Sequence, residues 1–237
     1  MKKLIMLMLA VGLATFLVAC GDDKDTEEET EGKDQKTDEQ AGQEVDVTED
    51  EKVAEDEVVA TINGTEVTGD QYNPVYLQTK LNAANYGMDV SDQEALKEQT
   101  INELIAQELI KQEAEDKGVE VTDEEVQNEL DVYKEENGDE FSAYLEQVQI
   151  TEDEFKDQIG FTLMLNKYME QELQVDEISD EEIKDTYDQL KEENEDIMSF
   201  EEAKTVLKQN LTKQKQNELL QAKIDELKEQ AEIETLI

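Results

Sequence analysis

The segment from Gln99 to Val126 constrains the fold more than any other part of this 237-residue chain. Its apolar residues recur at every third or fourth position, which is the spacing of one buried helix face. They are Ile101, Leu104, Ile105 and Leu109, with Ala106, Ile110 and Ala114 beside them. Gly118 can adopt the left-handed conformation that ends a helix. Thr122 then begins a second helix, because Glu125 stands three positions later as its capping-box partner.

The composition favours a mainly α-helical protein. One Pro and ten Gly interrupt few helices, and the hydrophobic fraction of 37% allows a modest core. The formal net charge is −44, so the surface repels nucleic acid and anionic membrane surfaces. Two explanations of the acidity stay open, namely adaptation to an alkaline or salty environment and attraction of basic, unfolded clients.

The residues that are missing limit the chemistry. The chain has no His, which excludes Ser-His and Cys-His nucleophiles and imidazole metal sites. Cys20 is the single cysteine, so no intramolecular disulfide can form. The many carboxylates include no pair that the sequence singles out for acid–base catalysis. We therefore expect no catalytic residue, no metal site and no cofactor.

The N-terminus has the pattern of a bacterial lipoprotein signal. Lys2 and Lys3 precede an apolar run over residues 4–18, which is too short for a stable transmembrane helix. Residues 17–21 read Leu-Val-Ala-Cys-Gly, which looks like a lipobox in which Cys20 is lipidated. We predict a signal peptide over residues 1–19 and a lipid anchor on the extracytoplasmic face of the cell membrane. The alternative is an ordinary secretory signal with an incidental cysteine.

Residues 20–57 are predicted to form a disordered acidic linker after the lipidated cysteine. They hold few large apolar residues, so ordering them would bury too little to offset the lost entropy. As a coil the linker would span on the order of 35 Å. A metal-binding tail is the alternative, but the linker lacks an Asp-x-Asp-x-Asp-Gly loop.

The folded domain is predicted over residues 58–237. Two β-prone runs flank Asn63 and Gly64, a dipeptide typical of two-residue hairpins. The end of the chain, residues 232–237, alternates polar and apolar side chains, and we expect it to pair with this hairpin as a third strand.

Several helices are predicted to follow this hairpin. The first covers residues 70–86, and the last covers residues 199–231 as one long helix or as two with a bend at residues 212–217. Capping boxes of the Ser/Thr-x-x-Glu type mark the starts of successive helices. These boxes are Ser91/Glu94, Thr122/Glu125, Thr151/Glu154, Ser179/Glu182 and Ser199/Glu202.

The predicted helix over residues 151–173 is apolar on more than one face around residues 159–169. Two explanations remain at this point. The helix is buried on two sides, or one side is an exposed surface that binds clients.

Several runs resemble the N-terminal chaperone domain of the SurA/PrsA foldases. Residues 59–68 read Val-Ala-Thr-Ile-Asn-Gly-Thr-Glu-Val-Thr, like the opening of that domain. The resemblance continues in residues 104–114, 118–126, 141–145 and 150–155. It also includes residues 178–184 and 200–203, which flank the prolyl-isomerase module in the family. It implies a mainly α fold, a helical chaperone domain with a small antiparallel sheet made by the N-terminal hairpin and the C-terminal strand.

The chain departs from this family in one respect. About fifteen residues separate Lys184 from Phe200, where the two-domain foldases carry a parvulin domain. The family's parvulin histidines are also absent. The resemblance therefore implies the chaperone domain without the isomerase.

Together these features predict a membrane-anchored extracytoplasmic chaperone that binds unfolded secreted polypeptides and assists their folding without catalysis. The alternatives are a divergent peptidyl-prolyl isomerase and an assembly lipoprotein with one dedicated partner. The expected partners are polypeptide clients and, through Cys20, the membrane, but not nucleic acid; the oligomeric state stays open. The candidate client-binding residues, each of which an ordinary core position also explains, are Tyr72, Tyr76, Phe161, Met164 and Tyr168.

Overall fold

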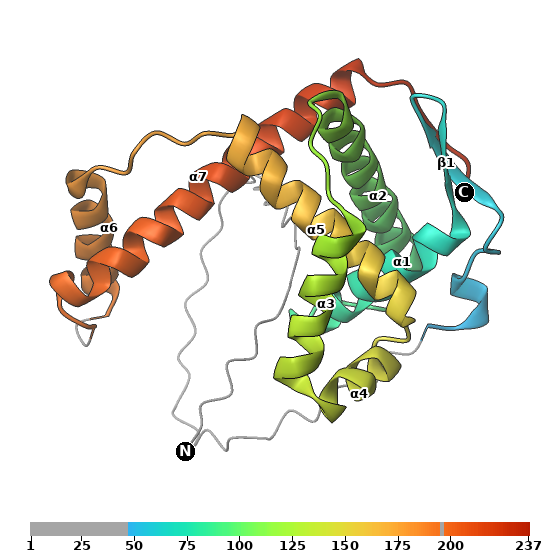
Figure 1. Cartoon of the computed structure of the whole chain (residues 1–237), viewed down its shortest axis with the longest axis horizontal. Coiled ribbons are helices and arrows are strands. Elements are labelled where there is room, and N and C mark those ends of the chain that lie inside the picture. The colour runs from blue at the N-terminus through green and yellow to red at the C-terminus, as the bar shows by residue number, and fades with distance from the viewer. Residues whose placement is uncertain (1–46, 195–196) are drawn as a thin grey trace, which may run out of the picture.

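A computed structural model of the chain describes residues 47–194 and 197–237. Within these ranges it contains seven α-helices, one short 3-10 helix and a three-stranded sheet, which confirms the predicted fold class (Figure 1). The strands are β1 (Val58–Ile62), β2 (Thr65–Thr68) and β3 (Ile233–Thr235). The helices are α1 (Gly69–Asn85), α2 (Gln93–Asp116), α3 (Asp123–Asn137), α4 (Asp139–Gln147), α5 (Glu152–Glu172), α6 (Asp180–Glu193) and α7 (Phe200–Gln230). The predicted signal peptide, Cys20 and the first part of the linker lie outside the described residues.

The sheet joins the two ends of the described chain. Its strand order is β2-β1-β3 and both pairings are antiparallel, as predicted for the hairpin and the C-terminal strand. Asn63 and Gly64 form the turn with positive φ angles of 51° and 84°. The Asn63 backbone N–H donates to the Glu232 carbonyl at 2.8 Å, and the Glu232 N–H donates to the Asn63 side chain at 2.9 Å. The turn residue therefore fixes both the hairpin and the returning strand.

Helix α2 is the centre of the body, by which we mean residues 47–172, the second half of α7 and β3. Its buried residues include those predicted for the central helix, and they face two different groups of elements. One face packs with α1 and the sheet, where Leu104, Ile105 and Leu109 join the largest apolar cluster. The other face contributes Ala106 and Ile110 to a second cluster with α5 and α7. A helix that is buried on two sides needs the wide apolar stripe that the sequence shows.

Capping boxes set most of the helix starts. The predicted boxes at Thr122, Thr151, Ser179 and Ser199 are present. The prediction for Ser91 is wrong, because Asp92 caps α2 and accepts from the Ala95 backbone N–H at 3.1 Å. Ser91 instead donates its hydroxyl to Asp89 at 2.6 Å, so the hydroxyl is committed to the preceding turn. A carboxylate at this position also interacts favourably with the helix dipole.

Residues 47–57, which we call the strap, are ordered although the sequence predicts a disordered linker there. The Val53 N–H donates to the Asn73 side chain at 3.0 Å, and the Asn73 amide donates back to the Val53 carbonyl at 2.9 Å. The strap also lies so close to α1 that a Cβ on Gly69 would stand 2.1 Å from the Ala54 carbonyl oxygen. The folded part therefore begins ahead of residue 58.

A buried ion pair explains why the acidic strap is ordered. The Lys80 ammonium donates to Glu51 Oε1 at 2.7 Å, and the Tyr76 hydroxyl donates to the same oxygen at 2.8 Å. The Thr48 N–H and hydroxyl donate to Oε2 at 2.8 Å and 2.9 Å. Burial alone would raise the pKa of Glu51, but these hydrogen bonds outweigh it and lower the pKa to about 2.

The α6 helix and the first half of α7, which we call the arm, extend away from the body (Figure 1). A separate apolar cluster holds the two helices together, and its buried members are Ile178, Ile183, Tyr187, Ala203 and Leu207. The α7 helix runs unbroken from Phe200 to Gln230, so the predicted alternative of a bend at residues 212–217 is not realised.

Candidate functional site

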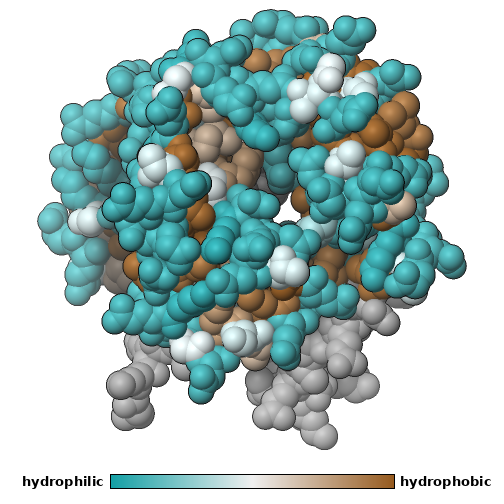
Figure 2. Space-filling model, turned by 45° about the vertical axis from the view of Figure 1, so that its right-hand side comes forward, coloured by the Kyte–Doolittle hydropathy of each residue, from teal (hydrophilic) through white to brown (hydrophobic). Residues whose placement is uncertain are grey.

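A groove with a volume of 2760 Å³ opens on the body and is lined by residues of α1, α2, α3, α5 and α7. Figure 2 shows apolar side chains gathered in hollows of the surface, with hydrophilic side chains around them. A space of this size is larger than a typical small-molecule pocket and suits a longer ligand.

The apolar floor of the groove comes mainly from α5. This helix is buried on two sides, because Phe155 and Ile159 pack with α3 and α4 while Leu165 and Tyr168 pack with α2 and α7. Between these faces, Phe161 remains partly exposed and lines the groove. Burial on two sides is therefore confirmed, and Phe161 adds a partly exposed apolar side chain to the groove lining.

The structure separates the five candidate binding residues into two groups. Phe161 and Met164 lie on the groove, and Met164 is also part of the α2–α5–α7 cluster. Tyr72 and Tyr76 stack on each other in the core, with 1% and 2% of their surface exposed. Tyr168 is equally buried. None of these three tyrosines lines the groove, and their burial leaves them no surface for a client.

Side-chain amides form a large part of the groove lining, and the sequence reasoning missed them. Thirteen Asn and Gln residues line the groove, including Gln78 and Asn82 on α1 and Gln99 and Asn102 on α2. A side-chain amide carries the donor and acceptor groups of a peptide bond, so it can pair with the main chain of any sequence. These residues follow no apolar period, and therefore only the packing of the helices reveals them.

The groove is strongly acidic. Twelve Asp and Glu residues line it against four lysines, which are Lys111, Lys156, Lys213 and Lys228. Glu103 is half-buried in the wall formed by α2, and it accepts a hydrogen bond from the Gln107 amide at 2.9 Å. Burial raises the pKa of Glu103, although Gln107 and the charge of Lys228 partly oppose the increase.

Among the described residues, the ion-paired carboxylate with the most buried side chain lies outside the groove lining. This carboxylate is Glu51, whose buried side chain belongs to the strap and accepts hydrogen bonds from Lys80, Tyr76 and Thr48. Within residues 47–194 and 197–237, no group of three or more metal-ligating side chains converges. Across the same ranges, no helix combines the length and the apolarity needed to cross a membrane.

The comparison with protein families agrees with this fold. The model of the SurA-like N-terminal domain matches residues 40–169, more than half of the chain, and the protein belongs to this family. Among curated proteins, the foldase protein PrsA of Caldanaerobacter subterraneus subsp. tengcongensis is 31% identical over 147 residues. That match covers 57% of this chain and 44% of the relative, so the chain matches less than half of the relative's length.

Proposed function

We propose that this protein is an extracytoplasmic chaperone that binds unfolded segments of secreted polypeptides in the groove and assists their folding without catalysis. The observation that carries the proposal is the combination of an apolar floor at Phe161 and Met164 with amide-rich walls. Such a surface accepts apolar side chains and main-chain amides from many sequences. Membership of the SurA-like family and similarity to a protein named a foldase support the same function.

The proposed location rests on the N-terminal sequence. Cys20 would carry the lipid anchor, and the acidic residues that follow would hold the groove above the membrane. Replacing Cys20 by Ser should move the protein from the membrane fraction to the soluble fraction. Retention of the Cys20→Ser protein in the membrane fraction would contradict the anchor.

The proposed absence of catalysis rests on the missing isomerase module. Six residues, 194–199, join α6 to α7, which leaves no room for a parvulin domain between them, and the chain has no His. The full-length protein should therefore not accelerate proline-limited refolding of a model substrate when it is present at catalytic concentration. Acceleration would favour the divergent isomerase instead.

Aggregation of an unfolded model protein tests the chaperone function. The full-length protein should suppress aggregation, and Phe161→Glu should weaken suppression because it places a charge on the apolar floor. Val206→Glu is the matched control, since Val206 is exposed on the arm and does not line the groove. Circular dichroism checks that both variants are folded.

The result also separates the chaperone from an assembly lipoprotein. If Phe161→Glu no longer suppresses aggregation while Val206→Glu still does, the result would support the proposal and place the binding surface at the groove. If excess wild-type protein suppresses nothing across several unfolded substrates, the general chaperone function is wrong and one dedicated partner becomes the better explanation.

A further inference from the structure

The groove has a charge pattern that its apolar floor does not require. We infer that it selects extended polypeptide segments that carry lysine or arginine beside apolar residues. This inference rests on the proposed polypeptide-binding function and specifies the class of client.

The first argument is the distribution of acidic residues over three of the helices that line the groove. Glu98 on α2, Glu129 on α3 and Asp157 on α5 all line the groove. No ion pair joins any of these three carboxylates to a lysine within the part of the chain that the structure describes. A bound segment would therefore meet uncompensated carboxylates on several sides.

The second argument is the fit of cationic side chains to this surface. A lysine or arginine has an aliphatic stem that can pack on the floor near Phe161 while its charged end reaches the acidic wall. An acidic segment has no such position, because its short side chains would hold negative charge next to the same carboxylates. The groove should therefore bind segments with neighbouring apolar and cationic residues more tightly than segments with acidic residues.

The third argument concerns other occupants of the groove. Residues 21–46 of this chain contain twelve acidic residues and three lysines. This segment, and a second copy of a protein with a formal net charge of −44, would both be repelled from an acidic groove. The same charge that attracts a basic client therefore disfavours binding of an acidic segment in the groove.

Fluorescence anisotropy with matched peptides tests the inference. The three labelled peptides have equal length and identical apolar residues, and they carry Lys, Ser or Glu at the same remaining positions. The full-length protein is titrated into each peptide in a buffer that contains a non-ionic detergent, and the same buffer without protein is the blank. At about 20 mM salt the lysine peptide should have a Kd about tenfold lower than the glutamate peptide, and this difference should largely vanish at about 500 mM.

The outcomes separate this inference from the function on which it rests. Equal Kd values for the three peptides would overturn the charge selection while leaving polypeptide binding intact. Failure to bind any peptide at either salt concentration would overturn the polypeptide-binding function itself, and the selection with it.

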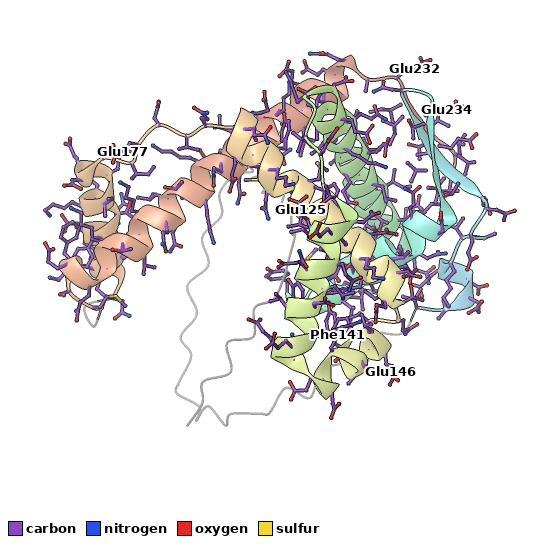
Figure 3. All side chains as sticks on the ribbon, in the orientation of Figure 1. Glu125, Phe141, Glu146, Glu177, Glu232 and Glu234 are labelled. Atoms are coloured by element: carbon purple, nitrogen blue, oxygen red, sulfur yellow. The ribbon has the colours of Figure 1, made fainter. Side chains whose placement is uncertain are left out.

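A pair of variants localises the effect to the groove. Glu98→Gln, Glu129→Gln and Asp157→Asn together should raise the Kd of the lysine peptide about fivefold at low salt. The control combines Glu146→Gln, Asp185→Asn and Glu234→Gln, which changes the net charge equally at exposed residues outside the groove lining. Figure 3 shows Glu146 on α4 and Glu234 on β3, at separate places in the fold. An equal loss of affinity in the control would overturn the inference, because the attraction would then come from the whole protein.

Discussion

The two halves of α7 have similar burial but different surroundings. In the second half, Leu220 and Ile224 are buried in a cluster to which α2 and α5 also contribute. In the first half, Ala203 and Leu207 are buried against α6 and the residues that flank it. The exposed fractions of Leu207 and Leu220 are 7% and 4%. The comparison teaches that the exposed fraction of a side chain does not reveal how many helices pack against it.

The ion pairs of the body and of the arm differ in how deeply they are buried. The body contains the Glu51–Lys80 pair, whose side chains are 1% and 9% exposed. The arm is joined by pairs such as Lys204–Asp180 and Lys208–Glu177, in which the acidic partners are more than 80% exposed. Removing one partner of a buried pair leaves an unpaired charge in the interior, whereas water replaces the partner of an exposed pair.

The largest effect is expected from Glu51→Ala. The change removes the carboxylate that accepts from the buried Lys80 ammonium, the Tyr76 hydroxyl and Thr48, and should lower the free energy of unfolding by about 4 kcal/mol. Urea unfolding followed by circular dichroism measures it. The double variant Glu51→Leu with Lys80→Met should recover most of the loss, because it removes both charges. A loss below about 1 kcal/mol in Glu51→Ala would show that the pair does not hold the strap.

The pH dependence should identify the same pair. The pKa of Glu51 is about 2 in the folded protein against an ordinary value of 4.5, so its contribution is complete above pH 4.5 and is lost as the pH falls toward 2. Glu125 and Glu182, whose pKa values are also lowered to about 2, act in the same direction. Acid titration of stability should therefore be less steep in Glu51→Gln than in the wild type. Equal steepness would assign the acid sensitivity to the other carboxylates.

Ile224→Ala and Leu207→Ala test the comparison of the two halves of α7 directly. Ile224→Ala should lower the free energy of global unfolding by about 3 kcal/mol, because the cavity lies where three helices meet. Leu207→Ala should instead open the arm locally and leave the global transition unchanged. Hydrogen exchange resolved along α6 and α7 measures the local effect. The comparison fails if Leu207→Ala shifts the global transition as much as Ile224→Ala does.

A smaller effect is expected at the polar stretch that joins the two halves. Gln216→Gly should weaken the helix there by about 1 kcal/mol relative to Gln216→Ala, because glycine loses more backbone entropy. The result should be faster hydrogen exchange in residues 212–217. Slower hydrogen exchange in residues 212–217, or a change in exchange confined to the body, would show that this stretch does not open separately from the rest of the fold.

The smallest effect is expected from Lys204→Ala. Its pair with Asp180 is exposed and screened by water, so the free energy of unfolding should change less than in any of the variants above. Thermal unfolding at low and high salt measures the contribution. A change as large as that of Glu51→Ala would remove the distinction between the charges of the two regions.

Local patterns in the sequence predict much of this fold. The Asn63-Gly64 hairpin, the stop at Gly118 and the boxes at Thr122 and Thr151 each depend on a few neighbouring residues. The C-terminal strand was predictable because it alternates and because a lone hairpin needs a partner.

Features that depend on distant pairings were not predictable. Glu51 looks like one of many solvated acids until Lys80, 29 residues later, is placed against it. The sequence cannot show that Tyr72 and Tyr76 face the core while Phe161 remains open to the groove. The amides of the groove carry no periodic signal, so their convergence follows only from the packing of α1, α2, α5 and α7.

The pairing of Asn63 with Glu232 has a consequence for the order of events during synthesis. The two residues are separated by 169 positions, so β1 leaves the ribosome long before the strand that completes its sheet. Contacts between such distant segments form late and slow the folding of a chain. The hairpin and α2 can collapse early, but the sheet closes only after the arm and all of α7 have been made. Such a delay would leave the sheet incomplete until the last residues of the chain have been made.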